Sequence, residues 1–487
     1  MGKLFIAKIF SQLILCAFLW GVTPATAIEA PFPDLGEHLE RVISIRSERL
    51  IGEMILQKIY GSGFALEDPI VNEYLQEIGL KFNTQASMTD FKLHFFGVDT
   101  PELNAFAFFG GHIAVHSGLI LAVENESELA AVLAHETAHI TQHHLARILA
   151  NNRKMLPFTF VEILAALAIG TLGEPDMGVH LATAAMAGHL QQLINFTREH
   201  EQEADRIGIQ LLAKTQFDPA AMASVFQRMK QNAYYRDLPP DYLLTHPLFD
   251  SRIADAQNRA EQFSYRQAPD SLFFQLVRAR LEAIKEENVS KKLSRLQETL
   301  NSGRYQHKTV AQYSYAVALL NHQKGKEALP ILKELNLRHP EEWIIALTLA
   351  EAEALTGGLQ SALKRSQTLL KLHPNNYAIT LQYANFLLQN EQPKIAIKLL
   401  FVQRKTHMAD PILHQTLAKA YSLDRQPTQL HRSQAEWHFA RGEFKEAFKQ
   451  LDLAAEYSEH DPQTLSQIKA RKAAIRDIQE EQRGLKL

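Results

Sequence analysis

Two histidines spaced four residues apart carry the first chemistry that this sequence suggests. They lie in His135-Glu136-Thr137-Ala138-His139. On a helix, residues i and i+4 stack on one face about one turn apart, so two such imidazoles can bind one metal ion from the same side. The carboxylate of Glu136 can reach a water molecule beside that ion without binding the ion itself. This is the H-E-x-x-H pattern of zinc peptidases, which supplies two ligands and a general base.

The residues before this motif predict the helix that must position it. Asn125 is a favourable N-cap, and Glu128 three residues later completes a capping box. Leu129, Val132 and Leu133 follow at helical spacing. We therefore expect one capped, apolar helix that holds both histidines on a single face.

A third ligand is expected from the acidic stretch of residues 199–205, and helical phase decides among its three glutamates. Glu201 lies three residues before the start of an apolar face, whereas Glu203 falls on the polar face and Glu199 lies towards the preceding loop. We therefore predict that Glu201 is the ligand and that Glu199 and Glu203 are solvated. The apolar face comprises Ala204, Ile207, Gly208 and Leu211.

Two residues near Glu201 are predicted to have roles other than binding the metal. Asp205 lies four residues further on the same face, where it could accept the free N–H of a ligand histidine and fix its tautomer. His200 lies near the buried face and is predicted to pack rather than to bind the metal.

A histidine downstream of the motif is the alternative third ligand. Metzincins place it six residues after the second histidine, with a glycine between them. This chain has Leu145 and Gln142 at those positions, which excludes that class. His143 and His144 follow on the same expected helix and cannot close a tetrahedron, so we expect both on the helix surface.

His246 and Arg252 are candidates for the remaining positions of the site. Pro247 disfavours a helical conformation for His246, which is therefore expected in a loop. His246 could stabilise the oxyanion, bind the metal as a fourth ligand, or be an ordinary surface histidine. Arg252, six residues further, is a second candidate for stabilising the oxyanion.

The chain is organised as an export signal followed by two folded parts. At 487 residues it is too long for one typical core, and its net charge of −3 gives no reason to expect nucleic acid. Residues 1–27 combine a basic start, an apolar stretch and Ala25-Thr26-Ala27, which predicts a signal peptide cleaved after Ala27. An uncleaved membrane anchor is the alternative. The only cysteine, Cys16, lies in this segment, so metal sites must use histidine and carboxylate.

Residues 28–265 are expected to form an α+β zinc-peptidase domain, mostly helical with a small sheet. Residues 91–96 alternate like a strand, and residues 104–116 are typical of a hairpin around Gly110-Gly111. We expect the edge strand near Ala114 to hold an extended peptide across the metal.

Residues 156–172 are mostly apolar, with Glu162 as the only charge. At this length they lie at the lower limit of a membrane span. A second amphipathic segment follows, and we interpret residues 156–196 as a buried helical hairpin that covers the site. Peripheral contact with a membrane through residues 156–172 is the alternative.

Residues 266–487 repeat with a period of 34. Four alanines are spaced by that interval, and a second set lies twelve residues further along each unit, which is the tetratricopeptide signature. We therefore expect an α-solenoid whose concave face binds extended segments or partner proteins. The two sets are Ala316, Ala350, Ala384 and Ala418, then Ala328, Ala362 and Ala396.

Together these features resemble the HtpX-like, CAAX-prenyl-protease-type zinc peptidases, in their BepA-like branch. The resemblance covers essentially the whole chain. It rests on the export signal, the His-Glu-x-x-His motif, the repeats, and three further motifs: Asn104-Ala105-Phe106-Ala107 before the glycine pair, Glu201-Gln202-Glu203-Ala204-Asp205, and Thr245-His246-Pro247. It implies a periplasmic zinc endopeptidase and chaperone of Gram-negative bacteria.

Carried over by position, the resemblance assigns roles to these residues. Glu136 becomes the catalytic base, Asp205 the partner of a ligand, and His246 the residue that sits on the zinc and restrains the protease. The ligands of one zinc ion become His135, His139 and Glu201.

The resemblance also implies partners. They are unfolded or stalled outer-membrane proteins, such as the lipopolysaccharide transporter LptD, and the outer-membrane assembly machinery BAM, with no nucleic acid. The rival interpretation is a non-proteolytic tetratricopeptide chaperone or adapter whose zinc is closed by four protein ligands. Replacing Glu136 with glutamine separates the two, because a structural zinc site tolerates the change and a peptidase loses turnover.

Overall fold

The computed structural model describes residues 44–85, 91–151, 198–234, 242–243, 246–264, 268–285 and 288–485. The predicted signal peptide, the predicted hairpin of residues 156–196 and the predicted domain boundary at residues 265 and 266 lie outside these ranges. Within the described ranges, none of the helices has the length and apolar character needed to cross a bilayer.

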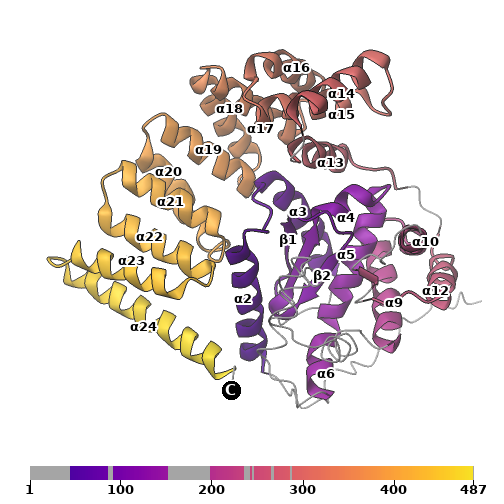
Figure 1. Cartoon of the computed structure of the whole chain (residues 1–487), viewed down its shortest axis with the longest axis horizontal. Helices are drawn as coiled ribbons and strands as arrows, with labels where there is room; N and C mark the ends of the chain where they lie inside the picture. The colour runs from indigo at the N-terminus through magenta and orange to yellow at the C-terminus, as the bar shows by residue number, and fades with distance from the viewer. Residues whose placement is uncertain are drawn as a thin grey trace, which may run out of the picture. The chain divides into compact units, whose positions relative to one another are not determined.

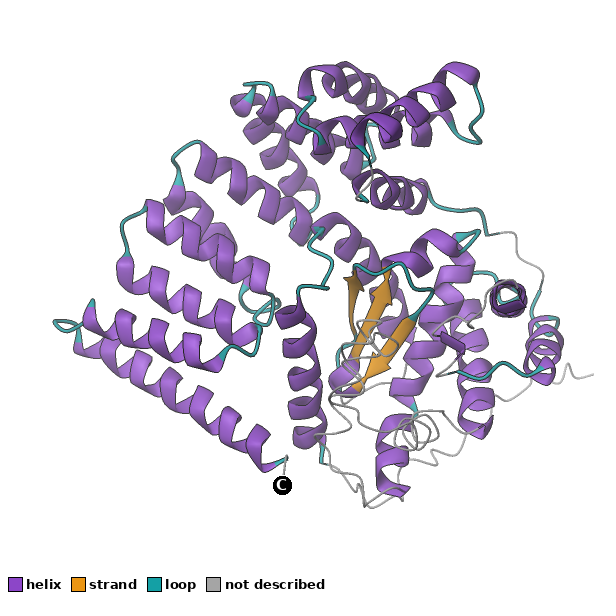
Figure 2. Ribbon diagram, viewed as in Figure 1, coloured by secondary structure: helices purple, strands orange, loops and turns teal. Residues whose placement is uncertain are grey.

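A three-stranded sheet lies beside the helix that carries the two motif histidines (Figure 2). Its strands are β1 (His94–Val98), β2 (Ala105–Phe108) and β3 (His112–His116), in the order β1-β3-β2. β3 is parallel to β1 and antiparallel to β2. The turn between β2 and β3 needs Gly110 and Gly111, because both have a positive φ near 80° that side chains disfavour. The predicted hairpin is therefore confirmed, and the first strand begins three residues later than predicted.

The predicted edge strand is wrong. Ala114 lies on β3, the central strand, where it is paired with Phe96 on one side and with Phe106 on the other. β1 pairs with β3 although β2 lies between them in the sequence. A local sequence pattern does not predict a pairing of this kind. The edge strand beside the metal helix is β2.

The same part of the chain has eight helices in the described residues, and α5 lies between the sheet and α9 (Figure 1). They are α2 (Ile45–Ser62), α3 (Pro69–Gln85), α4 (Ser117–Ala122), α5 (Glu126–Thr141), α6 (His144–Asn151), α9 (Arg198–Lys214), α10 (Ala221–Tyr234) and α12 (Asp250–Ala260). α5 contacts β2, α9 and α10, and it is buried along almost its whole length. The predicted metal helix is thus the central element of the predicted peptidase domain.

Two local features fix α5. The side chain of Asn125 accepts from the backbone N–H of Glu128 at 2.9 Å, as an N-cap should. The Glu128 carboxylate accepts from the N–H of Glu124 at 2.8 Å, one residue before the position that a capping box requires. Gly208 lets α9 come close, because a Cβ at that position would lie 3.2 Å from the backbone nitrogen of His135.

The rest of the chain is a run of paired helices. Their bounds are α13 (Leu272–Ile284), α14 (Val289–Ser302), α15 (Lys308–Asn321), α16 (Gly325–Arg338), α17 (Trp343–Leu355), α18 (Leu359–Leu372), α19 (Tyr377–Gln389), α20 (Pro393–Gln403), α21 (Pro411–Leu423), α22 (Pro427–Ala440), α23 (Phe444–Glu456) and α24 (Pro462–Gly484). α17, α19 and α21 begin 34 residues apart, and so do α18, α20 and α22. The periodic alanines are buried between these helices, so the predicted helical solenoid is confirmed.

The solenoid packs against two helices of the predicted peptidase domain. α3 contacts α13 and α19, where the backbone N–H of Tyr377 donates to Glu73 at 3.1 Å. α2 contacts α22 and α24. There the Gln57 amide donates to the carbonyl oxygen of Phe439, and Gln482 donates to Gln57, each at 3.1 Å.

Candidate metal centre

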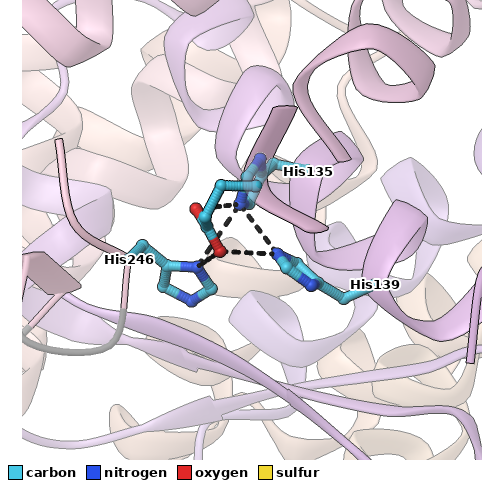
Figure 3. Close-up of side chains that lie close together, drawn as sticks. His135, His139 and His246 are labelled. Carbon is cyan, nitrogen blue, oxygen red and sulfur yellow. Dashed lines mark hydrogen bonds and ion pairs between the residues drawn. The ribbon is translucent and has the colours of Figure 1, made fainter. Parts of the chain in front are cut away.

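Four buried side chains from three parts of the chain meet at one point (Figure 3). His135 and His139 come from α5, Glu201 comes from α9, and His246 precedes α12. One ligand atom from each lies within 4.8 Å of all the others. The structure therefore brings together the two motif histidines, the glutamate chosen by helical phase, and the loop histidine.

The distances between these atoms suit a tetrahedral ion. A zinc ion with bonds of about 2.0–2.1 Å sets its four ligand atoms roughly 3.3 Å apart. Nε2 of His135 lies 2.9 Å from Nε2 of His139 and 3.4 Å from Nδ1 of His246. Oε1 of Glu201 lies 3.0 Å from Nδ1 of His246 and 3.5 Å from Nε2 of His139. These four distances lie close to the tetrahedral value, so the residues present fit a divalent ion.

Asp205 lies where helical phase predicts it. Its Oδ1 is 2.9 Å from Nδ1 of His135, the ring nitrogen that faces away from the centre. That contact leaves Nε2 of His135 available to a metal.

Arg252 lies behind the ligands, and its whole guanidinium group is engaged there. It donates to both carboxylate oxygens of Asp205 at 2.8 Å, and its Nη1 lies 2.7 Å from Glu201 and 2.8 Å from the carbonyl oxygen of Pro247. It also lies 4.8 Å above the ring of Phe226. The side chain is 1% exposed, so this arginine joins two of the site's carboxylates.

Glu136 stands between the centre and the edge strand. Its Oε2 accepts from the backbone N–H of Ala107 on β2 at 3.1 Å, and its Oε1 lies 3.5 Å from Nε2 of His246. Burial raises the pKa of Glu136, although His246 and His135 oppose that shift. A carboxyl group with a raised pKa beside a metal centre is suited to take up a proton.

The buried ligands differ in charge. Burial alone would raise the pKa of Glu201, but His246 and Arg252 hold it well below its usual range. Burial alone would lower the pKa of His135, but its contacts with Asp205 and Glu201 raise it to about 9. Burial lowers the pKa of His139 well below its usual value. The centre therefore has an anionic ligand that favours a cation.

The prediction that His144 lies on a helix surface is wrong. α5 ends at Thr141, and His143 takes a left-handed φ of 53°, so α6 starts at His144 in a new direction. His144 is fully buried, with Nδ1 2.8 Å from Nδ1 of His139. His143 remains partly exposed, as predicted.

The prediction that Glu203 is solvated is also wrong. Its Oε2 lies 3.1 Å from Nε2 of His144 and 3.0 Å from Nη1 of Arg147, and its side chain is 20% exposed. His200 packs flat against His144, with the ring centroids 4.5 Å apart, as its predicted packing role requires. Glu199 is exposed.

The sequence reasoning missed Tyr242. Its ring stacks on His246 with the centroids 4.6 Å apart, and its carbonyl oxygen accepts from the N–H of His246 at 2.8 Å. An aromatic residue four positions before His246 was the only signal available.

Comparison with known proteins shows the family to which the chain belongs. The profile described as "Peptidase family M48" matches residues 69–260. The "Beta-barrel assembly-enhancing protease" of Yersinia pestis is 33% identical over 85% of this chain and 86% of its own length. This chain belongs to the beta-barrel assembly-enhancing protease family. As a member of that family, it is a metallopeptidase.

Further relatives of the family agree with this placement. The "Beta-barrel assembly-enhancing protease" of Escherichia coli (strain K12) is 31% identical over 97% of both chains. "Mitochondrial metalloendopeptidase OMA1" of Schizosaccharomyces pombe is 31% identical over 37% of this chain and 50% of its own length. The similarity to the assembly-enhancing proteases thus extends through the helical repeats.

Proposed function

We propose that this chain is a periplasmic zinc endopeptidase and chaperone that acts in the assembly and quality control of outer-membrane proteins. The observation that carries the catalytic part is the placement of Glu136 between the four-ligand centre and the edge strand β2. The ligand set and its spacing support zinc as the metal.

The residues of the centre divide the work. The ion would be held by His135, His139, Glu201 and His246. When bound, zinc supplies Lewis acidity towards the scissile carbonyl. Glu136 takes the proton of the attacking water and passes it to the leaving amine. The N–H of Ala107 orients the Glu136 carboxylate for that transfer.

The substrate peptide is proposed to lie along β2. β2 is hydrogen-bonded to β3 on one side only, and it also contacts α5, the helix that carries Glu136. An extended peptide can add to such an edge by main-chain hydrogen bonds, and this would lay its carbonyl groups beside Glu136.

His246 is proposed to restrain the activity. A site closed by four protein ligands has no open position, which is the arrangement of structural zinc sites. Nδ1 of His246 takes up the fourth position here, 3.0 Å from Glu201 and 3.4 Å from His135. Proteolysis would therefore require His246 to withdraw. The same observation favours the second candidate function, a chaperone or adapter with a permanently closed zinc site.

Arg252 is proposed to position ligands rather than to stabilise the oxyanion. Its donors are directed to Asp205, Glu201 and the carbonyl oxygen of Pro247. By holding Asp205 it keeps the ring of a metal ligand in place, and by holding Pro247 it anchors the segment that carries His246.

The proposed partners follow from the relatives' names. Those relatives are called beta-barrel assembly-enhancing proteases. We propose unfolded or stalled outer-membrane proteins, including LptD-like clients, as substrates, and the BAM machinery as the place of action. The solenoid would supply the surface for the chaperone role. Export and the membrane contact of residues 156–172 stay predictions.

Cleavage of an unfolded model protein tests the proposal. Wild type and His246→Ala are compared, with Glu136→Gln as the blank. Faster cleavage by His246→Ala identifies a restraint, and slower cleavage identifies a residue of the catalytic apparatus. If neither protein exceeds the blank, the closed-site chaperone is the better description.

A further inference from the structure

A histidine outside the proposed ligand set touches one of the ligands. Nδ1 of His144 lies 2.8 Å from Nδ1 of His139, a distance that requires one of the two nitrogens to carry a proton and the other a lone pair. The rings are nearly perpendicular, with centroids 4.8 Å apart, so this contact joins them edge to face and is not a stacking contact. Both side chains are buried.

The position of each proton follows from the ligand geometry. His139 presents Nε2 to the centre, so that nitrogen must carry the lone pair that binds the ion. The single proton of its ring is then on Nδ1, and it is donated to His144. Nδ1 of His144 must accept, which leaves the proton of His144 on Nε2.

The Glu203 carboxylate enforces the tautomer that His144 needs. Its Oε2 lies 3.1 Å from Nε2 of His144, and a carboxylate can only accept there. Arg147 holds the same oxygen at 3.0 Å, and the ring of His200 lies flat on His144. The chain of hydrogen bonds thus runs one way, from His139 through His144 to Glu203.

The two motif histidines are therefore supported by different chemistry. The outer nitrogen of His135, Nδ1, lies 2.9 Å from a carboxylate oxygen of Asp205 itself. The outer nitrogen of His139 instead contacts a second imidazole, that of His144, which in turn contacts the carboxylate of Glu203. The reason is the break after α5, which directs His144 towards the outer edge of His139.

We infer that His144 is a positioning residue, which accepts the outer proton of His139 and thereby holds His139 in the tautomer and orientation that bind the metal, with Glu203 fixing the tautomer of His144. This inference rests on the proposed metal site. It adds a hydrogen-bonded relay on one side of that site. Loss of such a partner of a metal ligand typically reduces metal affinity about 10- to 100-fold.

Two amide replacements of His144 test the inference. The side-chain oxygen of asparagine takes the place of Nδ1, so His144→Asn retains the acceptor for His139. The amide of glutamine takes the place of Nε2, so His144→Gln retains the contact with Glu203 and loses that acceptor. Affinity for Zn²⁺ is measured on the full chain by competition with a chromophoric chelator. The absorption spectrum of the Co²⁺-loaded protein reports the ligand geometry.

The expected result is an order of affinities. His144→Gln should bind Zn²⁺ about 10- to 100-fold more weakly than wild type and give an altered Co²⁺ spectrum, whereas His144→Asn should bind about as wild type does. If His144 only filled space, the loss of its acceptor for His139 would not make His144→Gln bind Zn²⁺ more weakly than His144→Asn. Glu203→Leu should weaken binding less than His144→Gln does, and Glu199→Gln on the same helix should change nothing.

The outcomes separate this inference from the proposed function. If wild type binds one equivalent of Zn²⁺ and the two His144 variants bind it equally, His144 has no positioning role and the metal site stands. If wild type binds no Zn²⁺, both the metal site and the relay are overturned.

Discussion

The metal centre and the helical repeats bury opposite kinds of residue. The centre hides ionisable groups, and Glu136, Glu201 and Arg252 are each at most 1% exposed. The repeats hide alanine and leucine at periodic positions, with Ala350 and Ala384 fully buried. A buried charge in the centre is stable only because a group of opposite charge contacts it. A buried alanine in the repeats is required because the space between the helices is too small for a larger side chain. Sequence changes should therefore act through specific partners in the first region and through volume in the second.

The largest effect is expected from Glu136→Gln. The amide keeps the shape of the side chain and its acceptor for Ala107, but it cannot take a proton. Cleavage of an unfolded substrate should fall about 10²- to 10⁴-fold. Zinc content, measured on the same sample, should be unchanged. Turnover comparable to wild type would remove the proposed base.

Arg252→Leu should produce the largest loss of stability. It leaves the carboxylates of Asp205 and Glu201 buried without their cation. Removing one partner of a buried ion pair costs about 3–5 kcal/mol of unfolding free energy, which urea titration would measure. Arg338→Leu is the matched control in the repeats, because Arg338 pairs with Glu334 on an exposed helix surface. That change should cost less than about 1 kcal/mol. Equal losses for the two arginines would refute the contrast between the regions.

Ala362→Leu tests the volume rule in the repeats. Ala362 is fully buried on α18, and its neighbour Ser361 is exposed. Overpacking should cost about 1–3 kcal/mol, while Ser361→Leu should cost little. Binding of Zn²⁺ should be the same in both variants. A loss of metal affinity in Ala362→Leu alone would show that the regions are coupled.

Glu73→Gln should have the smallest effect, and it should depend on pH. Burial raises the pKa of Glu73 to about 7, although two backbone N–H groups of α19 oppose the shift. The folded state thus binds more protons than the unfolded state between pH 4.5 and 7, so wild type loses stability as the pH rises through that window. Between pH 5 and pH 8, the free energy of unfolding of wild type should fall by on the order of 1–2 kcal/mol more than that of the glutamine variant. Parallel stability profiles for the two proteins would contradict the assignment.

What the sequence predicted correctly depends on local periodicity. Helical phase selected Glu201 over its neighbours and placed Asp205 beside a ligand histidine, which the structure shows to be His135. The 34-residue period predicted the paired helices. These signals arise within one helix or one repeat, where spacing alone determines which face a residue occupies.

The features that the sequence did not predict depend on where a helix ends or on strands that pair although they are separated in the sequence. α5 ends without a glycine or proline, and a histidine takes the left-handed position, so His144 could not be separated from the helix before it. The contact of Glu203 with His144 follows from that break. The position of Ala114 at the centre of the sheet depends on β1 pairing with β3, which is a contact between separate segments.

The contact of α2 with α24 has a consequence for how the chain is made. Gln57 is bonded to Gln482, 425 residues later, and Arg46 pairs with Glu481. At roughly 5–20 residues per second, a ribosome synthesises these two partners about 20 to 85 seconds apart. Until α24 emerges, that part of α2 lacks its partner. Chains that end before α24 would therefore leave this part of α2 exposed to proteolysis, whereas chains that include α24 would cover it.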